Sequence, residues 1–110
     1  MSEGVRERDY PAYPLDEVRV AFERGRFEVT GRVQRHLERR GWRAATVRWC
    51  ICNLSPEDFH KSQAHRTESG VWLDIYKPLM GEERLYIKYM PFGDGERFIV
   101  LSFCGDGEPH

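Results

Sequence analysis

The sequence lacks the features that mark exported or membrane-inserted proteins. Its 110 residues contain no apolar run near the ~20 residues that a membrane-spanning helix needs. Residues 1–10 are charged and lack the apolar core of a signal peptide. Three cysteines are an odd number, and Cys50 and Cys52 lie two apart in a helical pattern, so no disulfide framework is expected. These absences favour a cytoplasmic protein in a reducing compartment.

Two common kinds of ligand site are also missing. The three cysteines and four histidines do not show the C-x2-C or H-x3-H spacing of zinc ligands. The glycines of residues 93–95 indicate a turn between strands, and no glycine-rich phosphate loop is present. We therefore expect neither a metal nor a small-molecule cofactor.

The sequence has little net charge, but the charge is unevenly distributed. Eleven arginines face eight acidic residues up to Leu54, whereas six basic residues face ten acidic ones from Ser55 onward. The overall charge of −1 gives no support for nucleic-acid binding, which usually shows a basic patch or stripe. A function on RNA must therefore depend on the local arrangement of side chains.

The size and the aromatic content indicate one folded domain. The chain is 13% aromatic, too much for a disordered protein, and 110 residues allow one hydrophobic core. We expect a flexible leader over residues 1–13, a single domain over residues 14–104 and a disordered tail over residues 105–110.

The first half of the domain shows the spacing of helices. Apolar residues recur at intervals of three and four, and Thr30 can cap the second helix. The pattern predicts helices over residues 14–25, 30–40 and 43–53, a short strand or extended link over 26–29, and a single helical turn at 55–58.

The second half shows the period of strands after a polar stretch. Residues 59–70 are polar and turn-rich, and alternation begins after Gly70. It predicts strands over residues 71–77, 85–92 and 97–104, joined by turns. Helices followed by a meander indicate an α+β fold, with N-terminal helices packed on a small antiparallel sheet.

Four blocks in this second half resemble the MqsR-like toxin family. Residues 54–62 resemble the stretch leading into its D-F-Y-K-S signature, and residues 71–78 are similar to its W-Q-D-V-Y-R-P strand. Residues 85–88 look like its Y-L/V-K strand, and residues 100–103 like its terminal V-I-S-F. The front half agrees more loosely, and the resemblance covers about residues 14–104.

The resemblance implies both a fold and a function. Members of this family are toxins of type II toxin–antitoxin systems with a RelE-like fold. They are ribosome-independent endoribonucleases, or mRNA interferases, that cleave single-stranded mRNA and are neutralised by a cognate antitoxin. The implied partners are therefore an antitoxin protein and mRNA.

The working residues of the family are only partly present. Lys61 stands at the lysine of the signature and Tyr86 at the tyrosine of the following strand. Leu73 replaces the usual glutamine, Cys104 replaces the usual lysine, and His60 replaces the tyrosine before the signature lysine. Two of the four expected polar groups are thus absent.

RNA cleavage through the 2′-hydroxyl needs a base, a cation for the phosphorane charge and an acid for the leaving oxygen. Lys61 could supply the cation, and Tyr86 could position or protonate the substrate. Alternation places Lys88 on the face of Tyr86, as a second cation. His60 could be base or acid near neutral pH, but an extended segment would send His60 and Lys61 to opposite faces, and only a turn would let them converge.

Two questions remain open from the sequence. An arginine stripe on the second helix could contact RNA phosphates, bind an acidic antitoxin segment or simply be solvated; it comprises Arg32, Arg35 and Arg39. Cys104 has no cationic neighbours in sequence, so a thiolate nucleophile is not expected. The losses at Leu73 and Cys104 favour an alternative function, a catalytically degenerate binding module without nuclease activity.

Overall fold

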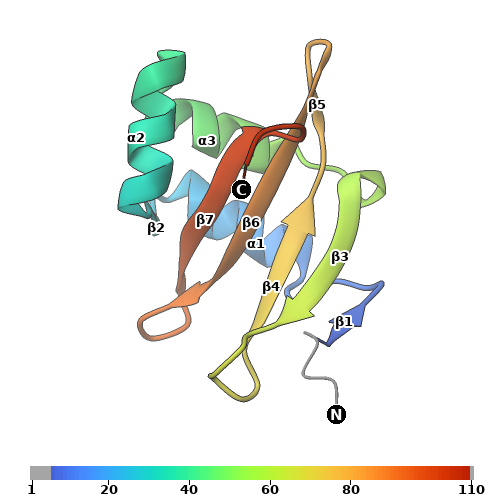
Figure 1. Cartoon of the computed structure of the whole chain (residues 1–110). Coiled ribbons are helices and arrows are strands. Elements are labelled where there is room, and N and C mark those ends of the chain that lie inside the picture. The colour runs from blue at the N-terminus through green and yellow to red at the C-terminus, as the bar shows by residue number, and fades with distance from the viewer. Residues whose placement is uncertain (1–5, 110) are drawn as a thin grey trace.

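The computed structural model describes residues 6–109. Within this range the helices lie in the first half of the chain, as the periodicity predicts (Figure 1). They are α1 (Leu15–Glu23), α2 (Gly31–Arg40), α3 (Ala44–Cys52) and the short 3-10 helix η1 (Pro56–Asp58).

The strands form one twisted sheet with a small added hairpin. They are β1 (Glu7–Arg8), β2 (Phe27–Val29), β3 (Phe59–Ala64), β4 (Trp72–Tyr76), β5 (Leu79–Met80), β6 (Glu83–Phe92) and β7 (Arg97–Gly105). Their order is β1-β3-β4-β6-β7-β2, and β5 pairs with β6. The pairs are antiparallel except for β2, which runs parallel to β7. The α+β prediction is confirmed, with one parallel edge strand added.

The helices form where local signals and burial agree. Thr30 accepts a hydrogen bond from the backbone N–H of Val33 at 3.2 Å, which caps α2. Gly41 ends this helix with a φ of 70°, a left-handed conformation that suits glycine. Val33 and Leu37 are buried four residues apart, so α2 packs one face against β7.

The main core lies between the helices and one face of the sheet. Phe22 of α1 stacks on Phe27 with ring centroids 4.6 Å apart, and the buried Tyr89 of β6 completes this contact. Figure 1 shows α1 and α3 behind the sheet and α2 beside β7. The opposite face carries a separate small cluster of Ile75, Tyr86 and Cys104. We call this opposite side the open face.

The prediction that residues 59–70 form turns is wrong for the first half of that range. Residues 59–64 form β3, which is paired on both sides, with β1 and with β4. The polar composition concealed this strand because its buried residue is Ser62, which lies opposite the equally buried Asp74. Pairing with two neighbours therefore decides this conformation more than the local sequence does.

Both ends of the described chain make specific contacts where loose segments were expected. Glu7 and Arg8 pair with β3, and the backbone N–H groups of Ala12 and Tyr13 donate to the Asp74 carboxylate. Near the C-terminus, Glu108 forms an ion pair with Arg40 of α2 and lies 3.3 Å from Nε2 of His36 on the same helix. Residues 1–5 and 110, which belong to the predicted leader and tail, lie outside the described residues. No helix within residues 6–109 is long and apolar enough to cross a membrane.

Candidate active site

A row of paired residues crosses the open face of the sheet. Lys61 of β3 pairs with Ile75 of β4, and Ile75 pairs with Lys88 of β6. Lys88 in turn pairs with Ser102 of β7. Cross-strand partners point to the same face, and Tyr86 lies two residues before Lys88 on the same strand. The fold therefore places Lys61, Tyr86 and Lys88 together on one face.

His60 reaches the same side of the sheet through an irregularity in β3. Phe59 pairs with Tyr76 and Lys61 with Ile75, so His60 is an extra residue at a bulge. A bulge interrupts the strict alternation of side chains. Burial, followed by the charges of Lys77 and Lys61, lowers the pKa of His60 below 6.5. The imidazole is thus close to the lysines of the open face, which simple alternation would have prevented.

Lys61 is held by a carboxylate that the sequence did not indicate. Its Nζ lies 2.8 Å from Oε2 of Glu7, which is exposed on β1. The hydrogen bond from Lys61 lowers the pKa of Glu7, as does a second bond from Gln63. Glu7 falls within the predicted leader, and nothing in its local sequence indicates a strand. The contact exists because β1 pairs with β3.

Tyr86 lies in a protected position beside a further lysine. It is 7% exposed, and Nζ of Lys77 lies 5.8 Å from the centroid of its ring. Lys77 also pairs with the carboxylate of Asp106 at 3.3 Å. Burial raises the pKa of Tyr86. The phenol is therefore protonated at neutral pH, as an ordinary tyrosine is, and carries a proton that a reaction can use. Lys77 was not among the predicted site residues, although it continues the alternation of Leu73 and Ile75.

Lys88 is half-buried among other cations. Its pKa is lowered first by burial and then by the charges of Arg32, Lys61 and Arg66. Arg66 lies in the loop between β3 and β4 and was not predicted as a site residue. These four side chains form a positive cluster, which we call the cation cluster. Such a cluster on a partly desolvated surface suits the binding of a phosphate group.

The two positions where the family has polar side chains, Leu73 and Cys104, hold buried apolar side chains in the structure. Leu73 is 8% exposed and lines a surface hollow together with Arg66 and Lys88. Cys104 is 4% exposed, and burial raises the pKa of its thiol to about 11. A thiol with this pKa is protonated at neutral pH, which agrees with the expectation that Cys104 is not a nucleophile.

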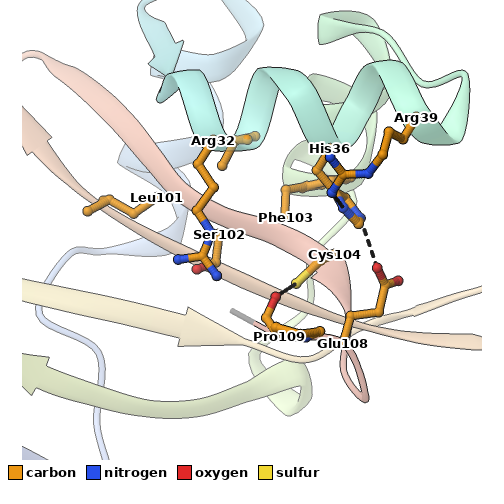
Figure 2. Close-up of a pocket in the computed structure, with 10 residues that line it drawn as sticks. Arg32, His36, Arg39, Leu101, Ser102, Phe103, Cys104, Glu108 and Pro109 are labelled. Carbon is orange, nitrogen blue, oxygen red and sulfur yellow. Dashed lines mark hydrogen bonds and ion pairs between the residues drawn. The ribbon is translucent and has the colours of Figure 1, made fainter.

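The arginine stripe divides into residues with different surroundings. Arg32 belongs to the cation cluster, and Arg32 and Arg39 line a cavity between α2 and β7 (Figure 2). Arg35 is exposed on the same helix and lies outside the lining of this cavity. The helix therefore does not present the three side chains as one uniform surface.

The open face can bind an anion and move protons with side chains alone. It brings together the predicted Lys61, Tyr86, His60 and Lys88, and it adds Glu7 and other charged groups. Within residues 6–109, no group of three or more His, Cys, Asp and Glu side chains is placed to hold a metal ion.

A comparison with protein families identifies the family of the chain. The sequence model of the family described as "Motility quorum-sensing regulator, toxin of MqsA" matches residues 10–104. The matched range contains Lys61, Tyr86 and Lys88, whereas Glu7 precedes it. No curated protein matches the sequence.

Proposed function

Because the chain belongs to the MqsR toxin family, we propose that its open face cleaves single-stranded mRNA without a metal ion and that a cognate antitoxin neutralises it. The observation that carries the proposal is the convergence of Lys61, Tyr86 and Lys88 on one face of the sheet, with His60 brought to them by the bulge in β3. The family supports a toxin of a toxin–antitoxin system, and the proposal assigns a reaction to this toxin.

The proposed reaction uses the 2′-hydroxyl of the RNA as the nucleophile. His60 accepts the proton of this hydroxyl, since its lowered pKa leaves the imidazole neutral at pH 7. The 2′-oxygen attacks the phosphorus, and the bond between phosphorus and the 5′-oxygen breaks. Tyr86 donates its proton to the departing 5′-oxygen. The products are a 2′,3′-cyclic phosphate and a 5′-hydroxyl.

The lysines stabilise the charge that develops during this reaction. Lys61 and Lys88 approach the phosphate from two strands of the same face. Fixed cations in a partly desolvated site stabilise a phosphorane more strongly than the ground-state phosphate. In this proposal Lys88 compensates for the missing cation at Cys104, while Glu7 holds the Lys61 ammonium until the RNA displaces it.

The test is cleavage of single-stranded RNA by the purified chain in a chelating buffer. Wild type is expected to cut, and Lys61→Ala is expected to lose about 10²-fold or more in rate, as when one stabilising group is removed. Arg48→Ala is the control, because Arg48 is exposed on α3 in the helical layer. Intact RNA with folded wild-type protein would refute the nuclease proposal.

The antitoxin is tested separately. Expression of the chain alone is expected to arrest growth, and co-expression with the protein encoded beside it is expected to relieve the arrest and give a stable complex. Arrest that the neighbouring protein does not relieve would contradict this part of the proposal.

One observation favours a second function, that of a binding module without catalysis. Leu73 and Cys104 are both buried and apolar where the resembling family has polar groups. A folded chain that binds RNA or a protein partner but leaves RNA intact would support this alternative. Gain of cleavage by the double variant Leu73→Gln, Cys104→Lys would then show that only the chemistry had been lost.

A further inference from the structure

A second hollow lies beside the open face, between α2 and β7. Its volume is about 170 Å³. Figure 2 shows Arg32, His36 and Arg39 reaching down from one side of α2 towards β7. The C-terminal turn closes the far end, where Glu108 and Pro109 lie near Cys104.

The size and lining of this cavity suit a flat ring. A cavity of ~150 Å³ is enough to hold a benzene molecule. Val33, Leu101 and Phe103 give it apolar walls, while Ser102 and His36 add polar groups. A pocket that combines apolar walls with a few polar groups is typical of sites for small planar ligands.

Two arginines at the cavity are available for an anion. Within residues 6–109, Arg32 makes no hydrogen bond or ion pair, and Arg39 contacts only the Nδ1 of His36, at 3.2 Å. Arg40 differs, because Glu83 and Glu108 already neutralise it. The guanidinium groups of Arg32 and Arg39 are therefore free to bind phosphates from the same helix face.

Glu108, the acidic residue among those that line the cavity, does not neutralise Arg32 and Arg39. Glu108 accepts hydrogen bonds from Arg40 at 2.9 Å and from the backbone N–H of Gly105 at 3.1 Å. It also lies 3.3 Å from Nε2 of His36. These contacts hold the carboxylate at the closed end of the cavity, away from Arg32 (Figure 2).

The cavity adjoins the proposed cleavage site. Ser102 lines the cavity and pairs with Lys88 across the sheet. Arg32 lines the cavity and also belongs to the cation cluster around Lys88. A strand of RNA with its phosphate at Lys88 would therefore place a neighbouring nucleotide against α2.

We propose that this cavity is a subsite for one nucleotide of the RNA, with its base between α2 and β7 and its phosphates on Arg32 and Arg39. The proposal rests on the nuclease function proposed above, and it adds a base-selecting element to that function. An aromatic base in an apolar slot and an arginine on each flanking phosphate are the usual components of single-strand recognition.

The test compares arginines on the same helix. Binding of a fluorescent single-stranded RNA and cleavage of a mixed-sequence RNA are measured for Arg32→Ala, Arg39→Ala and Arg35→Ala, with Arg48→Ala on α3 as the control. Loss of Arg32 or Arg39 is expected to weaken binding about tenfold, as for a hydrogen bond to a charged group. The variant Leu101→Trp enlarges a side chain of the cavity lining without changing its charge. It is expected to alter which sequences are cut, and circular dichroism verifies its fold.

The outcomes separate this subsite from the nuclease proposal. If RNA is cut but Arg35→Ala weakens binding as much as Arg32→Ala and Arg39→Ala do, the helix acts as a general basic surface and the subsite is refuted. The same holds if Leu101→Trp leaves the cleaved sequences unchanged. If RNA stays intact but only Arg32→Ala and Arg39→Ala weaken binding, the subsite stands and the nuclease proposal fails.

Discussion

At the scale of single residues, Lys88 carries its charge in an unfavourable position on the open face. Burial and three neighbouring cations oppose its charge, and they lower its pKa from 10.5. The charged form of Lys88 therefore lowers the free energy of unfolding at neutral pH, and this effect is lost as the pH rises through the lowered pKa. Strain of this kind is common where a charge is kept for function.

Replacement of Lys88 by methionine is therefore expected to stabilise the fold while it weakens cleavage. Methionine fills a similar volume without a charge, and a gain of about 1 kcal/mol would raise the melting temperature by about 4 °C in a domain of this size. Thermal unfolding followed by circular dichroism measures the change. Lys77→Met is the comparison, because it breaks the pair with Asp106 and is not expected to stabilise. A lower melting temperature for Lys88→Met would contradict this account.

His60 makes a prediction about pH. Burial, Lys77 and Lys61 lower its pKa below 6.5, so the neutral base persists at neutral pH and is lost as the pH falls through that lowered value. The value of kcat/KM is expected to fall on the acid side of pH 6.5, which gives the pH profile an acid limb. His60→Gln is expected to remove this limb and to lower kcat/KM by about 10²-fold or more. Lys77→Gln removes one of the cations and should move the limb towards pH 6.5. A limb that persists in His60→Gln would assign the base to another group.

At the scale of elements, β1 brings a negative charge to a positive site. Its pairing with β3 holds the Glu7 carboxylate 2.8 Å from Nζ of Lys61. An RNA phosphate must compete with this carboxylate for the same ammonium. An exposed pair of this kind is weak, so the RNA can displace it.

Glu7→Gln is expected to strengthen RNA binding a few-fold, because it removes the competing charge and keeps the shape of the side chain. Fluorescence anisotropy with single-stranded RNA gives the dissociation constants. Asp9→Asn is the matched control, since Asp9 is exposed two residues further along the same segment. If Glu7→Gln instead lowers the cleavage rate without improving binding, Glu7 serves to position Lys61.

At the scale of the whole molecule, the net charge of −1 conceals a local cation cluster. The cluster gathers Lys61, Lys88, Arg32 and Arg66 from three different elements and a loop. The logarithm of the binding constant for single-stranded nucleic acid falls with the logarithm of salt by ~0.7 for each phosphate contacted. Four such contacts predict a slope of about −3.

This slope can be measured from RNA binding at a series of salt concentrations. Lys61→Ala is expected to make it less steep by ~0.7, which is the share of one phosphate contact. A wild-type slope near zero would show that the cluster does not bind the RNA backbone.

The helices and the last strands follow from the sequence because their signals are local. The cap at Thr30, the stop at Gly41 and the alternation along residues 85–92 each depend on neighbours within a few positions. The strands β1 and β3 were not predictable in this way. Their hydrogen bonds go to partners far along the chain, and residues 59–64 carry polar side chains that resemble a turn.

The sequence by itself determined the α+β class and the order of the main elements, because periodicity is encoded locally. The resemblance to the family's motifs singled out Lys61 and Tyr86 as candidates, and alternation along the strand added Lys88. Only the tertiary structure decided that a bulge places His60 on the same face as Lys61 and that Glu7 reaches the site. It also decided that Arg32, unlike Arg35, belongs to the cation cluster around Lys88. The physical reason is that these contacts depend on strand register and helix docking, which are set by long-range pairing and burial.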